Sequence, residues 1–171
     1  MAQVAGFTFS DDTVYGARVR DLVGVGLIGT LGGSVSIVPG RYGNGLDCTG
    51  GALTVPVADD SYPLITDSGV TLAAWVKLND NTSADRCVAS ISGDSALKVG
   101  LFASNASGNV EARVMGVTYS TSTNVRDGQY HHLMVTVDLL TAPDRIRIVI
   151  DGVAVLDTTL TTPLSYTGGA T

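Results

Sequence analysis

The side chains of this sequence that could do chemistry are few, and two histidines are the first to consider. His131 and His132 are adjacent in the segment DGQYHHLMVTVD, residues 127–138. Neighbouring residues of a strand point to opposite faces, so the two imidazoles are not expected to bind one metal ion. His131 shares a face with Leu133 and Val135, which predicts a hydrogen-bonded core histidine.

Carboxyl groups placed for catalysis are also scarce. Glycoside hydrolysis on a β-sandwich uses two positioned carboxyl groups, but the single glutamate, Glu111, lies in NVEARVMG without an acidic neighbour. The adjacent pairs Asp11-Asp12 and Asp59-Asp60 are more typical of solvated loops. No serine has the spacing G-x-S-x-G, and neither cysteine has a nucleophile signature. No catalytic residue is expected, and the chain is predicted not to be an enzyme.

Metal and cofactor sites receive little support from the spacing of residues. The fifteen aspartates make calcium the ion to consider, because hard cations take carboxylate and carbonyl oxygens. No D-x-D-x-D-G array is present, and turn chemistry explains the aspartates as well. Calcium therefore stays open with no ligand set, and no other cofactor is expected. Cys48 and Cys87 could form one disulfide, but two buried thiols are the favoured interpretation.

One glycine-rich segment has the spacing of a phosphate-binding loop. GVGLIG, residues 24–29, fits G-x-G-x-x-G, a motif that needs a following helix to hold the pyrophosphate. The residues that follow, TLGGSVSIVPG, are not a helical pattern, so the match is interpreted as a coincidence. The uncharged stretch 22–40 is too rich in Gly, Ser and Thr to be a good spanning helix.

The composition restricts the partners. The chain has 171 residues, with sixteen acidic against ten basic side chains and a net charge of −6. This balance argues against a nucleic-acid partner. The N-terminus has neither the basic nor the apolar region of a secretory signal. We therefore expect no nucleic acid, no membrane insertion and no signal peptide.

Alternating hydrophobicity predicts an all-β chain. Helix-forming Glu and Lys are nearly absent, whereas strand and turn residues are abundant. In VTLAAWVKL, residues 70–78, the apolar residues from Val70 to Leu78 alternate, with Trp75 on the opposite face. Many short strands without helical crossovers predict an antiparallel two-sheet β-sandwich over a single domain, residues 1–171.

Turn residues locate two hairpins and a glycine cluster. RIRIVIDGVAVLDTT predicts a hairpin with a type I′ turn at Asp151-Gly152. A second hairpin is predicted from ALKVGLFAS and VEARVMGVTYST around the loop 105–109. In GRYGNGLDCTGG the glycines are expected to serve backbone geometry, with one turn over 40–45 and a second at Gly50-Gly51.

Five segments occur in a characteristic order along the chain. They are Asp21–Leu31, Gly40–Gly50, Thr71–Val76, Asp127–Leu133 and Val149–Val153. Together they resemble the concanavalin A-like, laminin-G-like jelly-roll superfamily, although Tyr130 stands where the family usually has Trp. The resemblance implies an antiparallel two-sheet jelly roll over most of the chain.

The resemblance also bears on the end of the sequence. Family members continue past TTPLSYTGGAT into a final strand pair, whereas this sequence stops at Thr171. The last strands usually pair beside the first, here Val4–Phe9, whose edge would otherwise be open. A fragment of a longer polypeptide is the favoured interpretation, and strand addition by a partner chain is the alternative.

The resemblance implies a non-catalytic recognition module for glycans or protein surfaces, often calcium-assisted. Because no signal is seen, we expect a phage tail or capsid-surface protein, made in the host cytoplasm, whose lectin-like domain contacts host-surface glycans. One alternative is a purely structural virion protein that binds other virion chains and no sugar. Another is an accessory module of an extracellular glycan-degrading enzyme, and a homo-oligomer is compatible with each. The tyrosines considered for sugar contact are Tyr15, Tyr62, Tyr119 and Tyr166.

Overall fold

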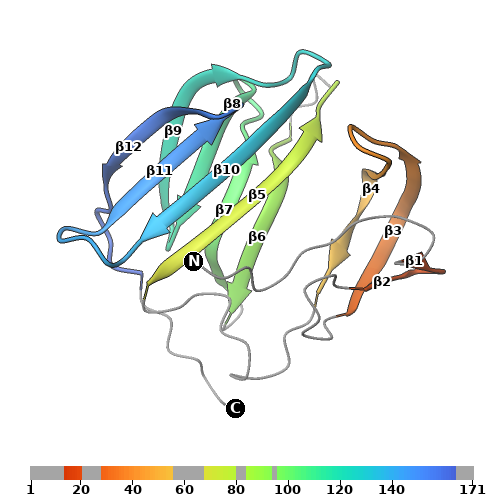
Figure 1. Cartoon of the computed structure of the whole chain (residues 1–171), viewed down its shortest axis with the longest axis horizontal. Helices are drawn as coiled ribbons and strands as arrows, with labels where there is room; N and C mark the ends of the chain where they lie inside the picture. The colour runs from red at the N-terminus through yellow and green to blue at the C-terminus, as the bar shows by residue number, and fades with distance from the viewer. Residues whose placement is uncertain (1–13, 21–27, 56–67, 80–83, 94–95, 165–171) are drawn as a thin grey trace. The chain divides into compact units, whose positions relative to one another are not determined.

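The computed structural model describes residues 14–20, 28–55, 68–79, 84–93 and 96–164. These residues form twelve strands and no helix, which confirms the all-β prediction and leaves no described helix that could cross a membrane (Figure 1). The chain divides into two compact units, Met1–Tyr62 and Pro63–Gly169. The single domain expected over residues 1–171 stays a prediction, and Val4–Phe9 lies outside the described residues.

The first unit contains one antiparallel sheet with the strand order β1-β2-β3-β4. Its strands are β1 Val14–Tyr15, β2 Arg18–Arg20, β3 Ile28–Pro39 and β4 Asn44–Thr54. β3 begins inside the GVGLIG motif, so a strand stands where a dinucleotide-binding loop would need a helix. Residues 24–27 of that motif lie outside the described residues.

The first glycine turn of this unit is as predicted. The Gly40 N–H donates a hydrogen bond to the Gly43 carbonyl oxygen at 2.7 Å, and β4 begins at the next residue, Asn44. Gly43 has a φ of 74°, a left-handed conformation that glycine adopts without steric cost. The glycines at 40–43 therefore reverse the chain between two strands.

The second glycine turn is a wrong prediction. Gly50 and Gly51 lie inside β4 and pair with Ser34 and Gly33 of β3. A Cβ at Gly51 would overlap the Gly32 carbonyl oxygen, so these glycines allow two backbones to approach closely. Sequence alone did not distinguish a turn from a close approach, because both need glycine.

The second unit is a sandwich of two antiparallel sheets, with strand orders β12-β11-β10-β5 and β6-β7-β8-β9 (Figure 1). Its strands are β5 Gly69–Lys77, β6 Arg86–Gly93, β7 Ala96–Ala103, β8 Asn109–Val114, β9 Val117–Asn124, β10 Tyr130–Asp138, β11 Arg145–Ile150 and β12 Val153–Thr159. Both sheets contribute to one hydrophobic cluster, with Val99 and Leu101 from one and Leu133 and Ile148 from the other. The shared core confirms the predicted two-sheet sandwich.

One hairpin prediction is confirmed and the other needs correction. Asp151 and Gly152 join β11 to β12 with φ values of 50° and 83°, both positive as a type I′ turn requires. The segment VEARVMGVTYST, expected to be one hairpin arm, is instead two strands, β8 and β9, joined at Met115 and Gly116. Met115 has a φ of 48°, an uncommon conformation for a methionine, so its residue type did not predict a turn.

Candidate functional site

Alternation along β5 and β10 separates the core face of this sheet from its outer face. Val70 on β5 and Leu133 and Val135 on β10 are buried against the other sheet. Trp75 points the opposite way and keeps 42 % of its surface exposed, as its sequence position predicts. The antiparallel register places Trp75 directly opposite His132.

His131 lies on the core side of β10, at the end of the strand. Its Nδ1 is 2.7 Å from Asp151 Oδ2 and its Nε2 is 3.1 Å from Asp127 Oδ1, while its side chain is 16 % exposed. The second Asp151 oxygen accepts a hydrogen bond from the His132 backbone N–H at 2.7 Å. The predicted hydrogen-bonded histidine is therefore confirmed, and it is partly rather than fully buried.

The two carboxylate contacts of His131 raise the pKa of its imidazole. Burial alone would lower the pKa of His131, but the hydrogen bonds with Asp151 and Asp127 outweigh it and raise the pKa above its ordinary value. A raised pKa means that the folded chain holds this proton more tightly than the unfolded chain does. His131 therefore forms ion pairs with Asp127 and with Asp151, which lies in the β11–β12 turn. We call these three residues the His131 cluster.

We expect the His131 cluster to make the free energy of unfolding fall as the pH rises. Its contribution is complete below the unfolded histidine pKa of about 6.5 and is lost as the pH rises through the higher folded pKa. Urea unfolding of the wild type and of His131→Gln between about pH 5 and pH 9 would measure it. The difference in unfolding free energy should shrink toward high pH, and a constant difference would contradict the assignment.

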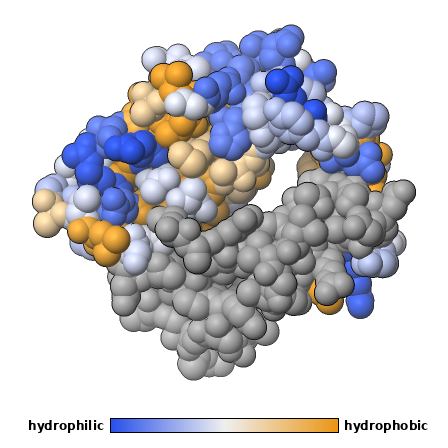
Figure 2. All heavy atoms as spheres, in the orientation of Figure 1, coloured by the Kyte–Doolittle hydropathy of each residue, from blue (hydrophilic) through white to orange (hydrophobic). Residues whose placement is uncertain are grey.

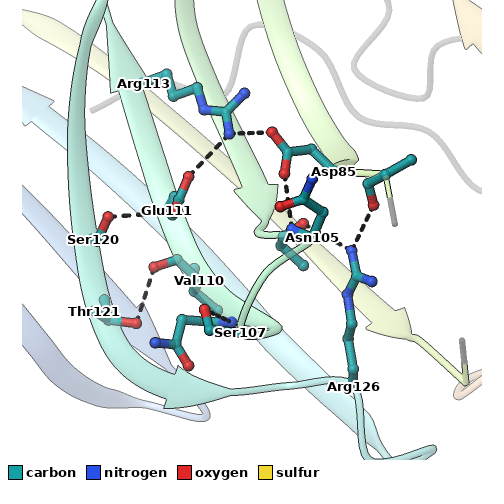
Figure 3. A network of polar contacts seen from close by, with 12 residues as sticks. Asp85, Asn105, Ser107, Val110, Glu111, Arg113, Ser120, Thr121 and Arg126 are labelled. Atoms are coloured by element: carbon teal, nitrogen blue, oxygen red, sulfur yellow. Dashed lines mark hydrogen bonds and ion pairs between the residues drawn. The ribbon is translucent and has the colours of Figure 1, made fainter. Parts of the chain in front are cut away.

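A second polar network lies around Arg113 of β8 (Figure 3). One Arg113 nitrogen, Nη2, donates to Asp85 Oδ2 and to Glu111 Oε2, the latter at 3.0 Å. The guanidinium lies 4.4 Å from the centroid of the Phe102 ring, and Ser120 Oγ donates to Glu111 at 3.3 Å. The fold thus gives Glu111 an acidic neighbour in space, Asp85, which the local sequence did not predict.

In this network Asp85 lacks the raised pKa that a glycosidase proton donor has. The acid–base pair of a glycosidase needs one carboxyl group with a raised pKa that donates a proton. Hydrogen bonds from the Arg113 side chain and the Asn105 backbone N–H instead lower the pKa of Asp85. The contact with Arg113 therefore favours the ionised form of Asp85, which does not suit this carboxyl group to donate a proton.

Carboxylates elsewhere in the second unit also have cationic partners. Asp157 of β12 accepts hydrogen bonds from Arg145 and Arg147 of β11 at 2.5–3.0 Å, which lower the pKa of Asp157. Among the described residues, no three His, Cys, Asp or Glu side chains gather where they could hold a metal ion. No ligand set for calcium is therefore assigned.

Four side chains, three of them with aromatic rings, lie together on the outer face of the sheet. The Trp75 and His132 rings lie 5.2 Å apart between centroids and are tilted by 49°. The next cross-strand pair is Lys77 with Tyr130, and the Lys77 Nζ is 5.6 Å from the Tyr130 ring centroid. We call these four residues the aromatic platform. It combines an apolar ring surface with N–H and O–H donors, the groups that suit the apolar and hydroxyl-bearing surfaces of a sugar.

Comparison with known proteins assigns the chain to a family. A laminin-G-type family model, described as the concanavalin A-like lectin/glucanases superfamily, matches residues 49–171. The chain belongs to this superfamily. No curated protein matches it. The matched residues include all eight strands of the second unit and the aromatic platform. The segment Asp21–Leu31, which also carried the resemblance, precedes the matched residues.

The four tyrosines predicted as candidates for sugar contact are not members of the aromatic platform. Tyr119 is 7 % exposed, and its hydroxyl accepts a hydrogen bond from the Thr161 N–H at 2.8 Å, so it is a core residue. Tyr15 is 59 % exposed in the first unit, and Tyr62 and Tyr166 lie outside the described residues. Trp75 was not named from the sequence as a candidate for sugar contact, although alternation predicts that Trp75 lies on the outer face of its strand.

The exposure of the two cysteines differs from the prediction of two buried thiols. Cys48 of β4 and Cys87 of β6 are both free thiols, and both are exposed rather than buried. Cys87 pairs across the strands with Phe102, whose ring lies on the outer face of its sheet beside Arg113. A strand position on the outer face explains why the Cys87 thiol is not in the core.

Proposed function

We propose that the chain is a non-catalytic recognition module that binds glycans through the aromatic platform. The observation that carries this proposal is the exposed ring of Trp75, packed against His132 in a group with no carboxylate. Membership of a lectin-type superfamily supports it. The lowered pKa of Asp85, which disfavours a role as proton donor, supports binding without hydrolysis.

The setting that we propose is the surface of a phage particle, where this domain contacts other virion chains and host-surface glycans. Two free, exposed thiols support synthesis in a reducing compartment such as a bacterial cytosol. Mass spectrometry of purified particles tests this setting, since the chain should co-purify with the virion proteins. Recovery of the chain only among secreted enzymes would contradict it.

Trp75→Ala tests glycan binding directly. A glycan array should give hits for the wild type, and the affinity for those hits should fall by at least about tenfold in Trp75→Ala, because a stacked aromatic anchor is lost. Tyr15→Ala is the matched control, since it removes another exposed aromatic ring, in the first unit. The control should bind like the wild type.

Two outcomes would contradict the proposal in different ways. Hits that Trp75→Ala retains at full affinity would remove the platform from the binding site. An array without hits for the wild type would contradict glycan binding itself and favour the purely structural virion protein. Thermal unfolding of Trp75→Ala should stay close to that of the wild type, because the ring is half exposed.

A further inference from the structure

We propose that the His131 cluster controls the aromatic platform, so that ligand binding weakens when the pH rises and His131 loses its proton. The inference rests on the proposed glycan binding and adds the regulation of that site. It is carried by the contacts of both ring nitrogens of His131. It also uses the position of the turn 127–129, which directly precedes the platform residue Tyr130 on the chain.

Both ring nitrogens of His131 face carboxylate oxygens. Nδ1 lies 2.7 Å from Asp151 Oδ2, and Nε2 lies 3.1 Å from Asp127 Oδ1. An ionised carboxylate only accepts hydrogen bonds, and a neutral imidazole has one N–H, so only the imidazolium donates to both carboxylates at once. The observed geometry therefore fits protonated His131, in agreement with the raised pKa of this residue.

The charged groups that face His131 come from two turns. Asp127 lies in the turn before β10 and Asp151 in the turn between β11 and β12, whereas β5 places the apolar Val76 opposite His131. Among the described residues, no cation and no further carboxylate forms a hydrogen bond or ion pair with the His131 ring. The Gln129 N–H and then His131 lower the pKa of Asp127, so Asp127 keeps its charge while His131 titrates.

The two carboxylates of the His131 cluster are fixed by different numbers of contacts. The Asp151 N–H donates to the His132 carbonyl oxygen at 2.9 Å, and Asp151 Oδ1 accepts from the His132 N–H at 2.7 Å. The Asp127 carboxylate has, besides His131, a contact within its own turn, from the Gln129 N–H at 2.8 Å. Asp151 is thus fixed to β10 independently of the His131 ring, whereas Asp127 is not.

This difference decides which contact opens when His131 becomes neutral. The remaining N–H is expected on Nδ1, which faces the closer and better fixed Asp151. Nε2 then presents a lone pair to Asp127 Oδ1, and two acceptors at this distance repel each other. We therefore expect Asp127 to move away from the ring at high pH while the contact with Asp151 remains.

The His131 cluster lies at a hydrated end of its sheet. The side chains of Asp127 and Asp151 are half-exposed. In Figure 2, hydrophilic residues gather at the top of the visible face, at the end of the sheet where β10 begins and β5 ends in Figure 1. Water therefore reaches the cluster, and the proton of His131 can exchange without opening of the core.

The turn that contains Asp127 is joined to the platform on both of its sides. The Gly128 N–H donates to the Leu78 carbonyl oxygen at 3.0 Å, and Leu78 directly follows the platform residue Lys77. On its other side the turn continues into Tyr130, whose ring centroid lies 5.6 Å from the Lys77 Nζ. Release of Asp127 therefore removes a support of the Lys77–Tyr130 pair, and a ligand would have to order this pair at a cost in entropy.

Binding should thus be strongest when His131 is protonated and should weaken as the pH rises through its pKa. Coupling between two sites is reciprocal, so a bound glycan should also raise the pKa of His131 further. Couplings of this kind usually change an affinity by about fivefold or more.

NMR of the ligand-free chain tests the link between the cluster and the platform. Between about pH 5.5 and pH 9, the Tyr130 ring resonances of the wild type should shift with the midpoint of His131 and not with that of His132. Asp127→Asn should remove this shift. An asparagine amide can accept from the protonated ring and donate to the neutral ring, so the contact should persist in both states.

Asp138→Asn is the matched control for Asp127→Asn. Asp138 Oδ1 accepts a hydrogen bond from the N–H two residues further on, that of Leu140, at 2.9 Å, as Asp127 Oδ1 does from Gln129. Asp138 ends β10, whereas Asp127 precedes it. The control should therefore keep the wild-type shift of Tyr130.

The glycan array, run at about pH 6 and about pH 9, measures the effect on binding. Wild-type signals from the immobilised glycans that depend on Trp75 should fall at least about fivefold at the higher pH. In Asp127→Asn the two signals should differ by less than about twofold. A pH step of wild-type size in His131→Gln would assign the step to the imidazole of His132 and overturn the inference.

The contrary results separate this inference from the proposed function. A Tyr130 shift that follows His132, or that persists in Asp127→Asn, would overturn the link between cluster and platform. Trp75-dependent signals that are equal at the two pH values would overturn the regulation while the proposed glycan binding stands. An array without hits at either pH would contradict the proposed function itself, whatever the Tyr130 resonances do.

Discussion

Replacement of Leu133 by alanine is expected to lower the free energy of unfolding by about 2–5 kcal/mol. Leu133 has no exposed surface and lies on β10, which is an interior strand between β5 and β11. Its partners across the strands are Ala74 and Ile150. Ala74 is too short to fill the space that a truncated Leu133 would leave. Urea unfolding at neutral pH measures the loss.

The matched control for Leu133→Ala is Val153→Ala. Val153 begins β12 and is 63 % exposed, so its truncation should change the free energy of unfolding by less than about 0.5 kcal/mol. If the two variants lost similar amounts of unfolding free energy, the space between the two sheets would not be the main hydrophobic core of the second unit.

Replacement of Arg113 by methionine should have the next largest effect on stability. The substitution keeps much of the side-chain volume beside Phe102 but removes the cation that Asp85 and Glu111 share. Two carboxylates would then remain close together without their shared cation, at a cost of about 1–3 kcal/mol at neutral pH. The side chains of Arg113 and Glu111 are 27 % and 14 % exposed, so solvent screens them only in part.

The pH dependence separates this electrostatic effect from lost packing. The pKa of Asp85 is lowered in the folded chain, so its contribution is present above its ordinary pKa of about 3.8 and is lost as the pH falls through the folded value. The difference between the wild type and Arg113→Met should therefore narrow in acid. Arg147→Met is the control and should cost less than about 0.5 kcal/mol, because Arg147 is exposed and Asp157 keeps Arg145.

Sequence patterns were most informative where one residue type has one structural use. Asp151-Gly152 predicted its turn correctly because few other conformations favour that pair. Met115-Gly116 makes an equally tight reversal, but methionine rarely adopts a positive φ and gave no signal. Gly50-Gly51 gave a signal with two meanings, a turn or a close approach of strands, and only the partner strand distinguishes them.

The site was less predictable than the fold because it depends on register. Alternation alone placed Trp75 outward on β5, and the opposite directions of His131 and His132 followed from the same rule. That Trp75 lies opposite His132 requires the pairing of two strands more than fifty residues apart in the chain. The contact between Arg113 and Asp85 likewise joins separate segments, so neither neighbour could be read from a local motif.

The two free thiols give a direct means of measuring distances in the native chain. Cys48 belongs to the first unit and Cys87 to the second, and each is the single cysteine of its unit. A nitroxide attached to each sulfur would let pulsed electron paramagnetic resonance report the separation of the units without any engineered residue. Desolvation of its sulfur and the neighbouring Asp47 carboxylate raise the pKa of Cys48. Efficient labelling of that position therefore calls for mildly alkaline buffer.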